Sequence, residues 1–318
     1  MNHALNPDTW IVGAGGMVGK AVASHVGERF LGQVYPWGDD SGVADAFRED
    51  ARRFVKATGE RPWRIFWVAG RGVVGASKSD LDSESRALQL LVDAVSEAQP
   101  RRRGVMVFAS SAGAVYAGSS VSPSTEATET VSQSAYGDAK LEQEAVVRAS
   151  SGAGVFSRTV IARISNVYGP GQDAQKPQGL ITHLCRAVVM RGTVNLYVPI
   201  DTRRHYIDAD DAAVQLVACA DRAAAIGEGA VVVKIITSGP SVTVGELVST
   251  VHQVAGRPIR VSRGMDARAS FQPVDLRLRS KVWSDIGDQQ GTSLVVGIDR
   301  VLRSIECSFA QGSARFSL

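Results

Sequence analysis

A glycine-rich turn follows directly on the first apolar run of this chain. The run ends at Val12, and Gly13, Gly16 and Gly19 come before the amphipathic stretch Lys20–Phe30. Glycines at a strand-to-helix turn let the chain reverse tightly and let the backbone approach a pyrophosphate, which the positive end of the helix then holds. The pattern therefore predicts a dinucleotide-binding turn at the start of an α/β fold. The residues expected to contact this cofactor are Gly13, Gly16, Met17, Val18 and Gly19.

The first half of the chain alternates short β-rich runs with segments of helical periodicity, which is typical of a doubly wound parallel sheet of the Rossmann type. The expected strands are Thr9–Val12, Gln33–Trp37, Arg64–Val68, Val105–Ala109 and Thr159–Ile164. The expected helices are Val18–Phe30, Ala44–Thr58, Leu81–Ala98 and Ala135–Ala149. Only one helical segment separates the second and third strands, where a common dinucleotide-binding half has a further short strand.

The sequence pattern changes after Asn166, where turn-rich segments replace the regular alternation of expected strands and helices. A strand is expected at Val231–Ile236 and a helix at Val244–Ala255. We therefore expect a smaller C-terminal lobe that binds substrate. The expected division is 1–169 plus 204–240 for the NAD(P)-binding domain, and 170–203 plus 241–318 for the lobe.

Composition narrows the classes of function. The 35 basic and 32 acidic residues leave a net charge of +3, without the concentrated positive charge that nucleic-acid binding needs. The three cysteines and five histidines do not have the spacing of metal ligands, so no metal is expected. No apolar run approaches the length of a membrane span and no signal peptide is evident, so we expect a soluble protein of the reducing cytoplasm.

Tyr136 and Lys140 stand four residues apart in an expected helix, and therefore on one face of it. A nearby ammonium favours the phenolate and is expected to lower the pKa of the tyrosine. Beside a nicotinamide, such a phenol can give or take the proton of a hydroxyl while hydride moves at the carbon. The same spacing arises often by chance on solvated helix faces, but here it follows a glycine turn and an expected strand, Val105–Ala109, after which Ser110 and Ser111 stand.

Together these segments resemble the extended short-chain dehydrogenase/reductases, and within them the nucleotide-sugar epimerase/dehydratase family. The glycines match the GxxGxxG form of that superfamily. The segments that carry the resemblance are Val12–Gly19, Phe108–Tyr116, Ser134–Lys140, Arg163–Gly171, Arg204–Asp211 and Thr243–Val248. They extend across nearly the whole chain.

The resemblance implies roles for individual residues. Tyr136 is the acid/base, Lys140 supports it and holds the nicotinamide ribose, and a hydroxyl after the strand at Val105–Ala109 polarises the substrate oxygen. Ala112 stands where the family usually has that hydroxyl, so we expect Ser111 to supply it, with Ser110 as the second choice and a merely structural serine pair as the alternative.

Two further residues match contacts with the sugar nucleotide. Asn166 matches an asparagine that contacts it, and Arg204 matches an arginine that grips its phosphates, for which a surface ion pair is the alternative. His205 stands where the family often has an acidic residue, and Pro199–Thr202 replaces a glycine-rich turn.

The adenosine end of the cofactor depends on an acidic residue about 20 positions beyond the turn. Asp39 and Asp40 lie at that distance, which favours NAD and leaves NADP possible. Ala69 and Gly70, directly after the strand Arg64–Val68, are also expected to contact the cofactor.

The expected reaction is hydride transfer at C4 of a nucleotide sugar, by a 4-epimerase or by a 4-ketoreductase. Dehydration is disfavoured, because Gly113 and Ala114 stand where dehydratases of the family have an acidic pair. The alternative is a non-catalytic NAD(P)-binding regulatory or assembly protein of the same fold. The family also implies a homodimer through the helices Leu81–Ala98 and Ala135–Ala149, with no nucleic-acid or membrane partner.

Overall fold

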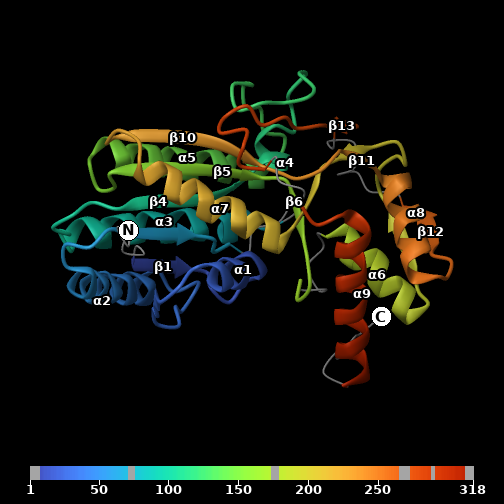
Figure 1. The fold of residues 1–318 in the computed structure, drawn as a ribbon, viewed down its shortest axis with the longest axis horizontal. Coiled ribbons are helices and arrows are strands. Elements are labelled where there is room, and N and C mark those ends of the chain that lie inside the picture. The colour runs from blue at the N-terminus through green and yellow to red at the C-terminus, as the bar shows by residue number, and fades with distance from the viewer. Residues whose placement is uncertain (1–7, 71–75, 173–178, 265–272, 288–290, 312–318) are drawn as a thin grey trace, which may run out of the picture.

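A computed structural model of the chain describes residues 8–70, 76–172, 179–264, 273–287 and 291–311. A six-stranded sheet runs through its larger part, in the order β2-β1-β3-β4-β5-β10 with every pairing parallel (Figure 1). Its strands are β1 (Asp8–Val12), β2 (Arg29–Phe30), β3 (Trp63–Trp67), β4 (Val105–Ser111), β5 (Arg158–Ile164) and β10 (Ala230–Ile236). The strand order reverses between β1 and β3, which is where doubly wound folds bind their ligands. The predicted Rossmann-type fold is confirmed.

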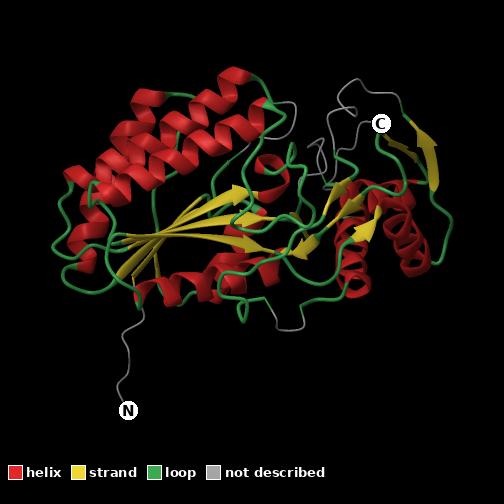
Figure 2. Ribbon diagram, turned by 90° about the horizontal axis from the view of Figure 1, so that it is seen from above, coloured by secondary structure: helices red, strands yellow, loops and turns green. Residues whose placement is uncertain are grey.

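Helices cover both faces of the sheet (Figure 2). One face carries α2 (Asp40–Thr58), α3 (Lys78–Glu97) and α5 (Ala135–Gly152), and the other carries α1 (Met17–His25) and α7 (Ala209–Ala224). Side chains alternate along a strand, so neighbouring residues of β1 enter different cores. Trp10 packs among the apolar residues of α2, α3 and α5, whereas Ile11 packs with those of α1 and α7. The near-continuous apolar strands follow from this burial on both faces.

The strand expected at Gln33–Trp37 is wrong, because this segment has no regular structure. The second strand is instead the two-residue β2, so the helix expected at Val18–Phe30 is also too long and ends at His25. The buried carboxylate of Asp50 on α2 explains the difference. It accepts hydrogen bonds from the backbone N–H of Gln33 (2.7 Å) and from the hydroxyl of Tyr35 (2.8 Å). These bonds draw the segment onto α2 and away from the sheet, and β2 is the edge strand.

The smaller part of the molecule has an apolar core of its own, in which Leu184, Leu247 and Ile298 are fully buried. Its helices are α6 (Leu180–Met190), α8 (Val244–Ala255) and α9 (Leu294–Ala310) (Figure 1). Among the described residues, seven short strands form three small sheets outside the six-stranded one, paired as β11-β8-β13, β12-β7 and β6-β9. They are β6 (Asn166–Tyr168), β7 (Thr193–Leu196), β8 (Arg203–Arg204), β9 (Tyr206–Asp208), β11 (Val242–Thr243), β12 (Arg260–Arg263) and β13 (Asp275–Leu276). The predicted helix Val244–Ala255 is confirmed in α8, and the strand predicted at Val231–Ile236 is confirmed in β10.

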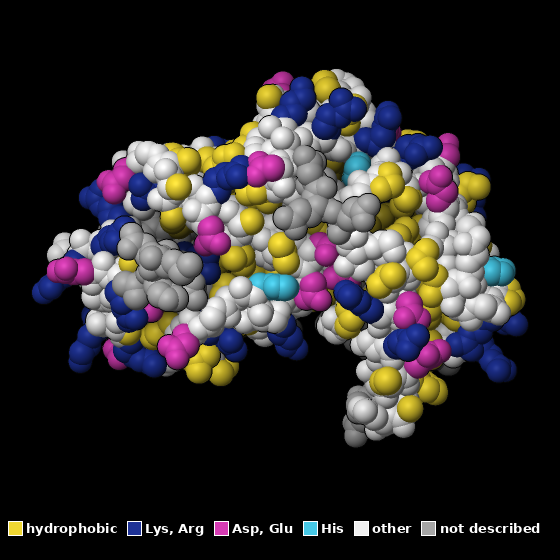
Figure 3. All heavy atoms as spheres, in the orientation of Figure 1, with side chains coloured by type: hydrophobic (Ala, Val, Ile, Leu, Met, Phe, Trp, Pro, Cys, Tyr) yellow, Lys and Arg dark blue, Asp and Glu magenta, His cyan; other side chains and the backbone are white. Residues whose placement is uncertain are grey.

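On the face drawn in Figure 3, basic and acidic side chains are interspersed over both parts of the molecule. None of the helices in the described ranges is long and apolar enough to cross a membrane. The described residues also contain no group of three or more His, Cys, Asp or Glu side chains that could hold a metal ion.

Candidate active site

The glycine turn lies at the carboxyl end of β1, at the amino end of α1. Gly13 has a φ of +95°, a conformation that side chains disfavour, and its carbonyl accepts a hydrogen bond from the N–H of Gly16 (3.0 Å). A Cβ added to Gly19 would lie 2.1 Å from the Gly13 oxygen, and one added to Gly13 would lie 2.5 Å from the backbone nitrogen of Ala69. The structure thus brings the predicted residues Gly13, Gly16, Gly19 and Ala69 together. At Gly13 and Gly19 there is therefore space for backbone atoms only. Glycines of this kind let the backbone of the turn come close to a bound pyrophosphate.

The acidic pair expected at the adenosine end is placed differently from the prediction. Asp39 is the N-cap of α2, and its Oδ1 accepts from the N–H of Gly42 (3.1 Å). Asp40 pairs with Arg86 of α3 at 2.6 Å. Both carboxylates therefore already have partners that position α2, and neither follows a strand.

The N-cap Ser134 begins α5, and its side chain accepts from the N–H of Gly137 (3.2 Å). Tyr136 lies in the first turn of this helix, and the side chain of Ser111 at the end of β4 lies close enough to act on the pKa of its phenol. Lys140 follows one turn later, with its Nζ 5.8 Å from the centre of the Tyr136 ring and 5.3 Å from that of Phe108. The structure thus places the three residues predicted to be catalytic side by side.

The electrostatics of this group differ from the expectation. Burial raises the pKa of Tyr136 to about 12, the carboxylate of Glu84 adds to the increase, and the side chain of Ser111 opposes it. Burial lowers the pKa of Lys140, while Glu84 and Glu144 oppose that change. The pKa of Tyr136 is therefore raised, mainly by burial, where the sequence predicted that Lys140 would lower it.

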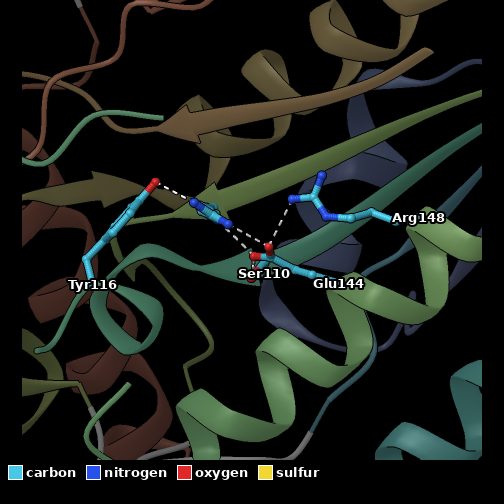
Figure 4. Close-up of polar contacts among 5 residues, drawn as sticks. Ser110, Tyr116, Glu144 and Arg148 are labelled. Atoms are coloured by element: carbon cyan, nitrogen blue, oxygen red, sulfur yellow. Dashed lines mark hydrogen bonds and ion pairs between the residues drawn. The ribbon is translucent and has the colours of Figure 1, made fainter. Parts of the chain in front are cut away.

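The side chains of Ser110 and Ser111 have different neighbours, and this distinguishes which of them can supply the hydroxyl beside Tyr136. Figure 4 shows the hydroxyl of Ser110 in a buried polar cluster, where it donates to Oε1 of Glu144 (2.7 Å). The same carboxylate accepts two bonds from Arg163, at 2.9 and 2.7 Å, and Arg163 also donates to the Tyr116 hydroxyl (2.6 Å). Ser110 therefore has a structural partner, whereas the side chain of Ser111 acts on the phenol of Tyr136. Ala112 is fully buried at the start of the short helix α4 (Ala112–Val115).

Three polar residues near the site were missed by the sequence analysis. Glu84 on α3 lies beside Gly70, where an added Cβ would be 3.4 Å from its Oε2, and no local pattern indicates it. Gln143 and Glu144 lie on α5 and are both almost fully buried. Their spacing of three and four residues from Lys140 is the signal that could have placed them on the same helical face.

The residues expected to hold the sugar nucleotide lie on short strands outside the six-stranded sheet. Asn166 is exposed on β6, and its Nδ2 donates to the His205 carbonyl (2.9 Å). Arg204 is partly buried on β8 and donates to the Arg203 carbonyl (2.8 Å). Burial lowers the pKa of Arg204, and Tyr206 and Asp275 oppose that change. Within the described part of the chain its guanidinium forms no ion pair.

Comparison with known proteins identifies the family. Residues 9–233 match the model of the NAD dependent epimerase/dehydratase family, and the chain belongs to that family. A curated relative, dTDP-4-dehydro-6-deoxyglucose reductase from Escherichia coli, is 26% identical over 202 residues, which are 64% of this chain. The match spans only 61% of that relative's length.

Solved structures share the fold over almost their whole length. UDP-glucose 4-epimerase from Thermotoga maritima, with UDP-glucose, has a TM-score of 0.77 and 18% identity, and the match covers 95% of this chain and 99% of that one. MoeE5 in complex with UDP-glucose and NAD has a TM-score of 0.75 and 20% identity, with the same coverage. UDP-glucose 4-epimerase from Bifidobacterium longum, with NAD+ and UDP, also has a TM-score of 0.75 and 20% identity, over 96% of this chain and 99% of that one.

The buried cluster of Figure 4 makes a testable contribution to stability. Replacing Glu144 by Gln keeps the volume of the side chain but leaves Arg163 as an uncompensated buried charge. We expect Glu144→Gln to lower the free energy of unfolding by about 3 kcal/mol, measured by urea denaturation. The control is Glu142→Gln, an exposed glutamate of the same helix, which should change it by no more than about 0.5 kcal/mol. Equal stability of the two variants would contradict the prediction.

Proposed function

We propose that this protein is an NAD-dependent nucleotide-sugar 4-epimerase or 4-ketoreductase, in which Tyr136 is the acid/base. The observation that carries the proposal is the grouping of the Tyr136 phenol with the side chain of Ser111 and with Lys140, whose Nζ lies 5.8 Å from the Tyr136 ring centre, on a fold whose glycine turn admits only backbone atoms at Gly13 and Gly19. The curated relative is named as a reductase and two of the solved structures as 4-epimerases, so both reactions have support.

NAD is the proposed cofactor, and NADP remains the alternative. The glycine turn fits its pyrophosphate, because a side chain at Gly13 or Gly19 would collide with backbone atoms. Gly16, Met17, Val18 and Gly70 are proposed to contact the cofactor with them. When bound, the nicotinamide supplies hydride to, or removes it from, a sugar carbon. Two of the solved structures of similar fold contain NAD or NAD+ with a uridine nucleotide. Asp39 can take part at the adenosine end only with the lone pairs that its capping bond leaves free.

The protein's own part in the reaction is the movement of one proton at Oη of Tyr136. With its pKa raised to about 12, the phenol is protonated at neutral pH and is ready to donate to the oxygen of a ketone. The opposite direction needs the phenolate, which hydrogen bonding from Ser111 and the positive charge of Lys140 both favour. Ser111 is proposed to polarise the same substrate oxygen.

The smaller part of the molecule is proposed to hold the sugar nucleotide. In this division, 170–203 plus 241–318 form the substrate lobe, and 1–169 plus 204–240 form the cofactor domain. Two residues of the cofactor domain that lie near its boundaries with the lobe, Asn166 and Arg204, are proposed to take part in the same site. The guanidinium of Arg204, which has no carboxylate partner in the described ranges, is proposed to bind the phosphates, and Asn166 to contact the nucleotide.

The proposed homodimer through α3 and α5 rests on the family resemblance. The exposed residues of these helices include Arg86, Gln89 and Asp93 on α3 and Asp138 and Glu142 on α5. Among the described residues, neither helix has an exposed large hydrophobic side chain. We infer that pairing across this face would depend on charged and polar contacts.

Gly19 and Gly15 offer a matched test of the cofactor site. Gly19→Ala should abolish NADH binding, measured by fluorescence titration, because its Cβ would collide with the Gly13 carbonyl at 2.1 Å. Gly15→Ala should bind as the wild type does, since an added Cβ meets nothing within 4 Å there. Thermal denaturation checks that both variants fold. Undiminished binding by a folded Gly19→Ala variant would argue against this turn as the cofactor site.

The reaction itself is tested with UDP-, dTDP- and GDP-sugars and their 4-keto forms, with and without NADH or NADPH. Net reduction identifies a ketoreductase, and isomerisation without added cofactor identifies an epimerase. Tyr136→Phe should lower kcat at least about a hundredfold, because it removes the proton that moves in the reaction. If wild type and Tyr136→Phe behave identically on every substrate, the enzyme hypothesis fails. Retained NAD(P) binding would then favour the non-catalytic alternative, to which Ala112 already points.

A further inference from the structure

The side chain of Gln143 lies buried between α5 and α3, next to the proposed catalytic lysine. Gln143 is 1% exposed and Lys140 is 5% exposed. Nζ of Lys140 donates to Oε1 of Gln143 at 2.9 Å, and Nε2 of Gln143 donates to Oγ of Ser85 at 3.3 Å. One amide thus connects the ammonium to a hydroxyl on the neighbouring helix.

The orientation of this amide is fixed by chemistry. An ammonium can only donate hydrogen bonds, so the side-chain oxygen of Gln143 must face Lys140. The amide nitrogen then has to find an acceptor on the other side, and Ser85 supplies it. Both ends of Gln143 are therefore used, and rotating the amide would set its NH2 group against the ammonium, where neither group can accept a hydrogen bond.

Within the described ranges, the hydrogen bond to Gln143 is the one that the ammonium makes to a neutral acceptor. The rings of Phe108 and Tyr136 present aromatic faces to it, at 5.3 and 5.8 Å from their centres. Two acidic groups, Glu84 on α3 and Glu144 on α5, also act on the ammonium and favour its charged form. The carboxylate of Glu144 already accepts hydrogen bonds from Ser110 and Arg163. A buried ammonium that loses a hydrogen-bond acceptor pays a desolvation cost and is free to turn.

We propose that Gln143 is a positioning residue for Lys140: its oxygen fixes the direction of the ammonium beside Tyr136, and its bond to Ser85 ties that direction to α3. This inference rests on the proposed function, because it matters for catalysis only if Lys140 serves the acid/base. With one of its three N–H groups held by Gln143, the ammonium keeps the other two for the phenol side and for the bound cofactor.

The first test observes the lysine without relying on activity. In full-length protein carrying nitrogen-15-labelled lysine, the ammonium signal of Lys140 is assigned by its loss in Lys140→Met and is then titrated. Gln143→Leu removes an acceptor that favours the charged form, so the Lys140 midpoint should fall by about one pH unit. Gln143→Glu keeps an oxygen and adds a negative charge, so the midpoint should rise. The control Gln253→Leu, an exposed glutamine on α8, should leave it unchanged.

The second test measures the reaction, with dTDP-4-dehydro-6-deoxyglucose and NADH as the probe. Gln143→Leu should lower kcat about tenfold with little change in the KM for the sugar, whereas Gln143→Glu should stay within a few-fold of wild type. If Gln143→Leu does not fold, Ser85→Ala removes the far bond alone and should lower both kcat and the Lys140 midpoint, by smaller amounts. A folded Gln143→Leu variant with wild-type kcat and midpoint would overturn the inference.

The two proposals can fail separately. If Lys140→Met reduces kcat but a folded Gln143→Leu does not, the role of Gln143 is wrong and the proposed function stands. If Lys140→Met and Tyr136→Phe both leave kcat unchanged, the proposed function fails, and the role of Gln143 in catalysis fails with it.

Discussion

The geometry of the site depends on the buried ion pair between Glu144 of α5 and Arg163 of β5. Both side chains are at most 5% exposed, and two hydrogen bonds join the guanidinium to the carboxylate. A pair of this kind contributes little net stability compared with apolar packing, but breaking it leaves a buried charge without a partner. It therefore acts mainly as a constraint on where α5 can lie. Because Ser110 also bonds Glu144, the same constraint sets α5 against the end of β4.

The Glu144–Arg163 pair fixes the position of α5, and the first turns of this helix hold the residues proposed to be catalytic. Tyr136 meets Ser111 near its beginning, Lys140 lies one turn further on, and Glu144 anchors the next turn. Gln143 holds the same stretch against α3. The Glu144–Arg163 pair thus fixes α5 against the sheet, and the Gln143–Ser85 bond fixes it against α3. Sites built on helices and strands held in this way keep a more precise geometry than sites built on loops.

Much of the fold was predictable because it follows from local patterns, and the failures have physical causes. The glycine turn and the spacing of Tyr136 and Lys140 indicated the fold and the proposed site. The strand at Gln33–Trp37 was wrong because a carboxylate 17 residues away, Asp50, binds its backbone. Which of Ser110 and Ser111 lies beside Tyr136 depends on the face of β4 that each side chain occupies. The raised pKa of Tyr136 results from burial and from Glu84, neither of which a spacing of four residues can reveal.

The central claim is that this site transfers hydride to a sugar carbon while Tyr136 moves the proton. It is tested most directly with NADH carrying deuterium at the transferable position of the nicotinamide, and with dTDP- or UDP-linked 4-keto sugars. Mass spectrometry and NMR of the product should find deuterium at C4 of the sugar with the wild type and almost none with Tyr136→Phe. A protein that binds NADH tightly but places no deuterium on any of these sugars would contradict the account.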